Sequence, residues 1–307
     1  MALGIVKAYV FVPKLVLEGE TVAYRGGGGP IDYNKLNKKG GCTANSLLDS
    51  DVKTVENTVE AVSESVSAGA DIIHLNVHRT SDNQLVVFHD WKLDCATNIT
   101  GAINKLSFKE IENVDAGFGY TYDDGVTFPF RGIGFKVSKL ETFYSLYPKY
   151  KFWLNLKNND KRSFNVLYTY LSNLPPFMTG RTMVMTSSKG IDWFRGKDLN
   201  IRTASVGSVK SCGVDYFLVG WAGVVPKSCR NTTLLIPPSL TKYFWGYPKR
   251  LAANLQEYGS DVYLWSKHHP IDQKLSAIVK DGVGVVTSDL HFINRVKNTK
   301  LVNKNAS

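Results

Sequence analysis

Two short apolar segments dominate the hydrophobic pattern of the chain, at residues 71–77 and 84–88. Both have the length and β-branched content of buried strands, and a polar turn at residues 81–83 joins them. His74 and Asn76 are two positions apart in the first segment, so a strand points both side chains to the same face.

His89 and Asp90 directly follow the second segment. An α/β barrel builds its site from polar side chains at the carboxyl ends of consecutive parallel strands. With the two segments taken as such strands, we expect the functional site at this place.

Apolar segments of strand length alternate with helical patterns along the rest of the chain. Further strands are predicted at residues 21–24, 151–156, 182–185, 201–204, 234–236, 262–265 and 283–287. Helices are predicted at residues 56–68, 107–114, 139–147 and 161–174. The alternation repeats about eight times, which favours a parallel sheet closed as a TIM-type (β/α)8 barrel. A doubly wound open sheet is the alternative, but the first strand is not followed by a glycine-rich nucleotide-binding motif.

The chain has no convincing domain boundary, so a single domain is predicted. We expect an N-terminal lead-in at residues 1–20, the barrel at 21–297 and a tail at 298–307. A polar, irregular stretch up to residue 55 reads as a loop inserted after strand 1.

The chain is basic, with a formal net charge of +10 over 307 residues. A phosphate, an acidic lipid surface or a nucleic acid would fit this charge, although scattered basic residues also suit a solvated surface. Zinc-finger spacing and RNP-like motifs are missing from the sequence, so we expect no nucleic-acid partner. Residues 2–17 are apolar but too short and too charged for a transmembrane segment.

Four cysteines allow three disulfide connectivities, and the residues alone leave the pairing open. Their positions are Cys42, Cys95, Cys212 and Cys229. The even number leans towards disulfides and an extracytoplasmic location, periplasmic or secreted, with buried free thiols as the alternative.

Several short motifs resemble, in order and context, those of the glycerophosphodiester phosphodiesterase family, in particular its bacterial branch. The matching segments are Tyr24-Arg25-Gly26, Glu56-Asn57-Thr58, His74-Leu75-Asn76, His89-Asp90, Asn155-Leu156-Lys157 and Thr287-Ser288-Asp289. The resemblance implies a barrel that acts on phosphodiesters in lipid metabolism. It also implies that Cys42 lies near Cys95 and Cys212 near Cys229.

The resemblance implies a site in which two histidines act as general acid and base, an arginine holds phosphate, and carboxylates bind a divalent metal. Of the family's motif residues, this chain retains Arg25, Gly26, Glu56, His89, Asp90 and Lys157, which the resemblance assigns to catalysis and phosphate binding. It departs at the first histidine, which is Tyr24, and at three metal-binding carboxylates, which are His74, Asn76 and Asn155.

These departures remove the charged oxygen ligands that Ca²⁺ and Mg²⁺ prefer, and tyrosine is a poor proton shuttle at neutral pH. We therefore expect no metal cofactor, and we expect a pseudoenzyme that binds phosphodiesters or anionic lipid head groups with lost or much reduced hydrolysis. One alternative is an active hydrolase of a glycerophosphodiester or lysophospholipid with a changed metal site, such as zinc on His74 and His89. The other is a non-catalytic scaffold.

Peripheral contact with a membrane is an open option. The aromatic segment Tyr243-Phe244-Trp245 with Tyr247 suits either packing or a lipid-facing surface.

Overall fold

Eight parallel strands form a nearly closed barrel, as expected for a TIM-type (β/α)8 fold. The computed structural model describes all residues except 1–16, 33–34, 37–41, 49–50, 266–274 and 306–307. Most of the expected lead-in therefore lies outside the described residues. In spatial order, the barrel strands are β7 (Arg202–Ala204), β6 (Thr182–Met185), β5 (Lys151–Leu156), β2 (Ile72–Arg79), β1 (Thr21–Ala23), β10 (Val283–Thr287), β9 (Asp261–Trp265) and β8 (Thr233–Ile236).

One prediction about the strands is wrong. β3 (Leu85–Val87), the second of the two apolar segments, pairs antiparallel with β2 and extends to the short β4 (Ser138–Lys139). It is therefore not a barrel strand. A connection of only a few residues can close a hairpin, whereas a parallel crossover needs a dozen or more. The turn includes Asn83 at φ 65°, a conformation that asparagine tolerates well.

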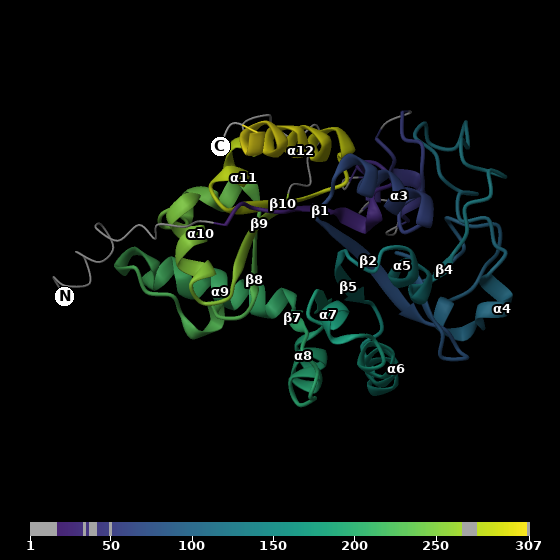
Figure 1. The fold of residues 1–307 in the computed structure, drawn as a ribbon. Helices are drawn as coiled ribbons and strands as arrows, with labels where there is room; N and C mark the ends of the chain where they lie inside the picture. Colours follow the sequence, from purple (N-terminus) through teal and green to yellow (C-terminus); the bar gives the residue numbers. More distant parts are fainter. Residues whose placement is uncertain (1–16, 33–34, 37–41, 49–50, 266–274, 306–307) are drawn as a thin grey trace.

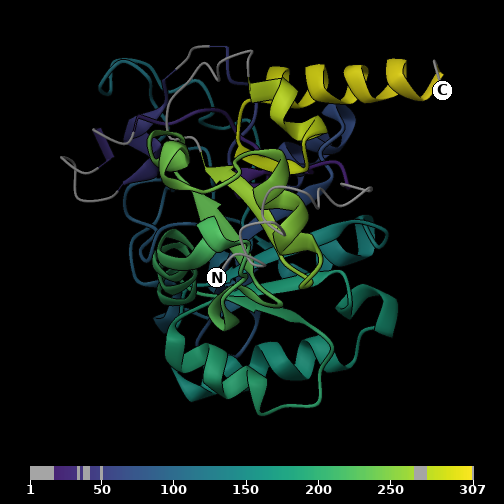
Figure 2. The ribbon, with the colours of Figure 1, turned by 90° about the vertical axis from the view of Figure 1, so that its left-hand side faces the viewer.

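The helices surround the barrel, and the yellow α11 and α12 lie over β10 in Figure 1. The longer ones are α3 (Val59–Ala68), α5 (Leu140–Leu146), α6 (Lys161–Ser172), α8 (Ser188–Arg195), α9 (Val206–Val219), α10 (Lys249–Gln256), α11 (Leu275–Lys280) and α12 (Leu290–Asn305). α4 (Phe108–Ile111) and α7 (Pro176–Thr179) are four residues long each. Figure 2 shows the same arrangement turned by 90°.

Local signals explain several helix ends. Thr58 accepts a hydrogen bond from the Ala61 amide at the start of α3, and Gly69 ends that helix in a left-handed conformation. A capping box of Ser107 and Glu110 is present at the start of α4. α12 continues to Asn305 and so passes residue 297, where we expected the barrel to end.

Strand β2 contributes to two separate hydrophobic clusters, one on each of its faces. Its residue Ile72 packs inside the barrel with Val22, Trp153 and Tyr263. The alternate positions of β2 face the other way, and a separate cluster there buries Ile73, Leu75 and Val77 with Phe143 and Phe164 of α5 and α6. Because His74 and Asn76 share the parity of Ile72, their side chains face the barrel interior.

Both expected cysteine pairs form disulfides. Cys42 bonds to Cys95, which joins the inserted loop after β1 to the segment after β3. Cys212 bonds to Cys229, which joins α9 to η5 (Lys227–Cys229), a short 3₁₀ helix before β8.

Candidate functional site at the barrel mouth

The chain leaves β1 through η1 (Tyr24–Gly26), a 3₁₀ turn at the carboxyl end of the barrel. Arg25 lies in this turn at φ 56°, ψ 31°, a left-handed conformation that is uncommon for residues other than glycine. This conformation directs the Arg25 amide to His74, and the distance from the amide nitrogen to Nδ1 is 3.1 Å. An N–H can donate only to an unprotonated ring nitrogen, so the contact places the imidazole proton on Nε2.

Burial keeps His74 neutral. Its side chain is 3% exposed. Burial first, and then the positive charges of Arg25 and Lys157, lower the pKa of His74 from 6.5 to about 3. A neutral imidazole with its proton on Nε2 is a hydrogen-bond donor on that side.

The Arg25 guanidinium forms a buried ion pair with Glu56. Nη1 lies 2.7 Å from Oε2, and both side chains are under 5% exposed. The ring of Tyr24 stacks on His74 with centroids 4.9 Å apart, and Trp265 lies 5.9 Å from Tyr24. The mouth therefore has an aromatic wall beside a charged pair.

Two asparagines face each other across neighbouring strands, since Asn76 of β2 and Asn155 of β5 are register partners. Asn57, at φ 62°, accepts a hydrogen bond from the Asn76 amide and donates one from Nδ2 to the Asn76 Oδ1. The Asn76 Nδ2 group is buried without a hydrogen-bond partner among the described atoms, and so is Glu56 Oε1. A buried polar atom of this kind is a candidate ligand contact.

The hairpin returns the chain to the mouth. The amide of Phe88 donates to the carbonyl of Asn76, so the next residues, His89 and Asp90, lie at the level of the site. His89 Nδ1 is 2.8 Å from Asp90 Oδ1, and Thr43 donates to the other carboxylate oxygen.

Burial controls the protonation of this pair. Burial, followed by the charge of Arg25, places the pKa of His89 well below its usual value. Burial also raises the pKa of Asp90, although hydrogen bonds from Thr43 and the Arg25 charge oppose this rise. A neutral imidazole oriented by a carboxyl group can accept a proton as a general base.

Lys157 follows β5 at the same end of the barrel. Its pKa is lowered, mainly by burial and then by the Arg25 charge, while Asp90 and Glu56 oppose the shift. The charges of Arg25 and Lys157 also lower the pKa of His74 and that of His89. These contacts and couplings bring the predicted residues together in one site: Tyr24, Arg25, Glu56, His74, Asn76, His89, Asn155 and Lys157.

The glycine run after Arg25 has a packing role in the fold. Gly26, Gly27, Gly28 and Gly29 all have positive φ. A Cβ on Gly28 would lie 2.1 Å from the Glu56 amide nitrogen. The absence of side chains here lets the turn approach the start of α3, which positions Arg25 beside Glu56.

Sequence reasoning missed three contributors to the mouth. Thr43 holds Asp90, Asn57 holds Asn76, and the fully buried His78 contacts the carbonyl of His89 through Nε2. The alternation of β2 puts His78 on the face of His74 and Asn76, so the sequence pattern could have identified His78 as a site residue. Thr43 lies in an irregular loop, and no sequence pattern points to it.

One group of side chains in the described residues is close enough to share a metal ion, namely Cys42, Asp90 and Cys95. The two cysteines are joined in a disulfide, so their sulfurs are not free thiolates that could bind a metal.

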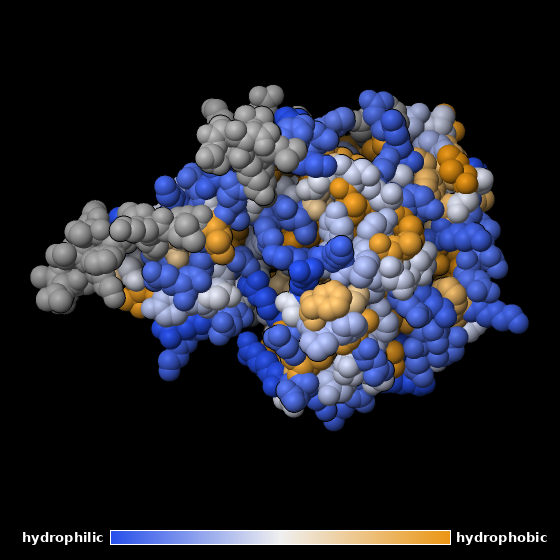
Figure 3. Space-filling model, in the orientation of Figure 1, coloured by the Kyte–Doolittle hydropathy of each residue, from blue (hydrophilic) through white to orange (hydrophobic). Residues whose placement is uncertain are grey.

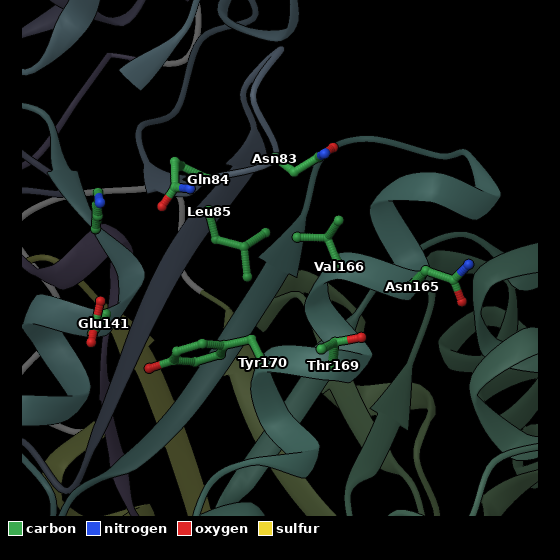
Figure 4. A pocket seen from close by; sticks show the side chains of 9 residues that line it. Asn83, Gln84, Leu85, Glu141, Asn165, Val166, Thr169 and Tyr170 are labelled. Carbon is green, nitrogen blue, oxygen red and sulfur yellow. The ribbon is translucent and has the colours of Figure 1, made fainter. Parts of the chain in front are cut away.

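Three cavities of the described part of the chain lie away from the mouth. The one in Figure 4 has a volume of about 340 Å³ and lies between the β2–β3 turn, α5 and α6. Its lining includes Asn83, Glu141 and Tyr170, none of which the family motifs contain.

The fold and the site define a class, a parallel α/β barrel whose polar side chains gather at the carboxyl ends of its strands. Residues 41–185 match the Glycerophosphoryl diester phosphodiesterase family. A putative glycerophosphodiester phosphodiesterase, YhdW, of Bacillus subtilis is 40% identical over 65 residues, 21% of this chain and 27% of the relative. The match to this family covers just under half of the chain, and it agrees with the resemblance that the sequence motifs indicate.

Solved structures agree with this fold. The glycerophosphodiester phosphodiesterase of Agrobacterium tumefaciens has a TM-score of 0.58 at 20% identity, over 90% of this chain and 99% of the other. A phosphodiesterase of Oleispira antarctica, in complex with the product sn-glycerol-3-phosphate, has a TM-score of 0.54 at 14% identity. The match covers 95% of this chain and 98% of the other. The chain matches well under half the length of the curated relatives, 27% and 31% for the first two. None of the described helices is long and apolar enough to cross a membrane.

Proposed function

We propose that the barrel mouth binds phosphodiesters or anionic lipid head groups without a metal ion, and that metal-dependent hydrolysis is lost or much reduced. The observation that carries this proposal is the hydrogen bond from the Arg25 amide to His74 Nδ1. It leaves a hydrogen-bond donor where the family resemblance implies a metal-binding carboxylate.

Other donors support an anion site. Asn76 Nδ2 is buried with no partner among the described atoms. Lys157 adds a positive charge that burial makes less solvated. Glu56 Oε1 is an acceptor that a hydroxyl group of a polyol ligand would satisfy.

The oxygen donors of the mouth do not fit a hard divalent cation. Glu56 Oε2 is held by Arg25, and the Asp90 carboxyl group is held by His89 and Thr43. Asn76 and Asn155 offer neutral amides, whereas Ca²⁺ and Mg²⁺ sites use charged oxygens. His74 Nδ1 is already an acceptor, so a zinc site on His74 and His89 would lack ligands as well.

Binding is tested by calorimetry with glycerophosphocholine and with sn-glycerol-3-phosphate, in EDTA and again with Mg²⁺ or Ca²⁺. We expect the same Kd in both buffers. Lys157→Met removes a charge-assisted contact and should weaken binding about tenfold. The matched control is Lys151→Met at the other end of β5, which should leave Kd unchanged. If no phosphorylated ligand binds, only the scaffold interpretation remains.

Catalysis is tested separately, by release of glycerol phosphate from glycerophosphocholine and from a lysophospholipid with Ca²⁺, Mg²⁺, Mn²⁺ or Zn²⁺. We expect no metal-stimulated turnover. Turnover that a His89→Ala substitution abolishes would show an active hydrolase with a changed metal site. The set Tyr24→His, His74→Glu, Asn76→Asp and Asn155→Glu should create divalent-metal binding, because it adds three carboxylates to the mouth.

An extracytoplasmic location is also proposed, since both cysteine pairs form disulfides and disulfides persist in oxidising compartments. Contact with a membrane is a separate proposal, because it depends on another face of the molecule.

A further inference from the structure

An exposed apolar stripe runs along the second half of α9 and into η4 (Gly220–Ala222). Val214, Phe217, Leu218 and Trp221 are spaced i, i+3, i+4 and i+7, the spacing of one helical face. Their exposed fractions lie between 46% and 59%. A solvent-facing helix surface is ordinarily polar. An exposed apolar stripe of this kind is typical of a surface that binds another molecule or a membrane.

The segment around η6 (Pro238–Tyr243) continues the stripe. Tyr243 and Trp245 are each 49% exposed, and Tyr243 packs edge-on against Phe217. A groove of about 450 Å³ is lined by Phe217 and by residues 241–247, Lys242 among them. We call the surface of Val214, Phe217, Leu218, Trp221, Tyr243 and Trp245 the aromatic ridge. In Figure 3, an orange patch at the lower left coincides with the far end of α9.

The indole N–H groups of the two ridge tryptophans already have hydrogen-bond acceptors within the protein. The indole N–H of Trp221 donates to the Leu218 carbonyl, and that of Trp245 donates to the Phe217 carbonyl. These carbonyls belong to the last turn of α9, where no helical partner is available. The rings can therefore enter an apolar phase without breaking a hydrogen bond to the protein.

The segment of the chain that carries the ridge is basic. Residues 205–250 contain six basic side chains and one acidic side chain, so their formal charge is 6 − 1 = +5, half of the net +10 of the chain. The basic residues are Lys210, Lys227, Arg230, Lys242, Lys249 and Arg250. The one acid, Asp215, accepts a hydrogen bond from Ser228.

We propose that the aromatic ridge docks on an anionic phospholipid surface. Aromatic rings and short apolar side chains that insert at the head-group level, with basic residues around them, are the composition of an interfacial membrane contact. A second copy of this chain is a poorer occupant, because it would bring two positively charged surfaces together.

The disulfide of Cys212 and Cys229 supports this proposal, since it fixes α9 to η5 and so presents the ridge without further ordering. The ridge is independent of the mouth. α9 begins after the carboxyl end of β7 and runs back, so its last turn lies towards the opposite end of the barrel (Figures 1 and 2). Docking would leave the mouth open to solvent.

The test is co-sedimentation of the full chain with vesicles of phosphatidylcholine alone and with 30 mol% phosphatidylglycerol, at low and at high salt. We expect binding to the anionic vesicles that high salt weakens. Phe217→Ser/Leu218→Ser should lower the partition coefficient about tenfold or more, and Lys210→Gln/Lys242→Gln should reduce it on anionic vesicles. The matched control is Val126→Ser/Ile133→Ser, two apolar residues of the 117–134 loop that are 80% and 61% exposed, which should bind like the unchanged chain.

Thermal unfolding confirms that each variant is folded, and light scattering reports the oligomeric state. The proposal is overturned if the unchanged chain does not bind anionic vesicles, or if both double-serine variants bind equally. It is also overturned if the chain is a dimer that only Phe217→Ser/Leu218→Ser dissociates. None of these outcomes depends on ligand binding at the mouth.

Discussion

At the scale of single residues, the backbone of Arg25 has two consequences for the mouth. Its left-handed conformation directs the amide to His74 and leaves the guanidinium beside Glu56. A left-handed conformation costs a residue with a side chain about 1 kcal/mol or more, and the buried ion pair and hydrogen bond offset that cost. The arginine therefore fixes the protonation of its neighbour as well as its own position.

The buried histidines make stability depend on pH. The pKa of His74 and that of His78 are both lowered from 6.5 to about 3, in each case mainly by burial. Below about pH 6.5 the unfolded chain binds more protons than the native state. The free energy of unfolding therefore falls as the pH decreases from about 6.5 towards 3.

We predict that His78→Phe flattens this dependence. Loss of one such histidine should reduce the slope between pH 5 and 6.5 by up to about 1.4 kcal/mol per pH unit. Urea unfolding at several pH values measures the slope. His291→Gln, a change at an exposed histidine of α12, is the control and should keep the slope of the unchanged chain. An unaltered slope in His78→Phe would show that this residue titrates alike in both states.

At the scale of elements, the β2–β3 hairpin and the inserted loop build one wall of the mouth together. The hairpin brings His89 and Asp90 back to the level of Asn76, and Thr43 of the loop holds the Asp90 carboxyl group. The disulfide of Cys42 and Cys95 joins the loop to the segment that follows the hairpin, and the described residues of loop and hairpin share no strand pairing. This covalent link keeps the irregular wall in place.

We predict that the two disulfides contribute unequally to stability. They close loops with sequence separations of 53 and 17 residues. The chain-entropy estimate is about 4 kcal/mol for the longer loop and about 3 kcal/mol for the shorter one. Guanidinium unfolding of Cys42→Ser/Cys95→Ser and of Cys212→Ser/Cys229→Ser compares them. A larger loss for the second pair would show that local strain or packing outweighs chain entropy.

At the scale of the whole molecule, the barrel has a seam between β7 and β8, the two ends of its strand order. Arg202 of β7 crosses the seam, donating to the carboxylate of Asp261 and to the carbonyl of Thr232. The hydroxyl group of Thr233 contacts the sulfur of Met183 inside the barrel at 3.4 Å. Side chains therefore take the place of backbone pairing at this point.

We predict that Arg202→Met lowers the free energy of unfolding by about 1–2 kcal/mol. The partly exposed ion pair contributes little, but the Thr232 carbonyl loses one of its two donors and keeps only the Asp261 amide. Urea unfolding measures the change. Arg181→Met, which removes a donor to a single exposed carbonyl, should cost no more than about 0.5 kcal/mol. Equal losses in both variants would exclude a special role for the seam.

The sequence by itself determined the barrel class, most strand positions, the family motifs and, through the resemblance, the cysteine pairs. These follow from local periodicity and from residue types in order along the chain, which need no knowledge of distant contacts. It also marked most of the residues that meet at the mouth, because parallel strands bring their carboxyl ends to one edge.

The tertiary structure alone decided the antiparallel course of β3, the tautomer of His74, the seam at Arg202 and the exposure of the aromatic ridge. Each depends on residues far apart in sequence, such as Arg25 and His74 at 49 positions. Pairing, burial and proton position are set by such contacts in space, and the hydrophobic pattern of one segment does not contain them.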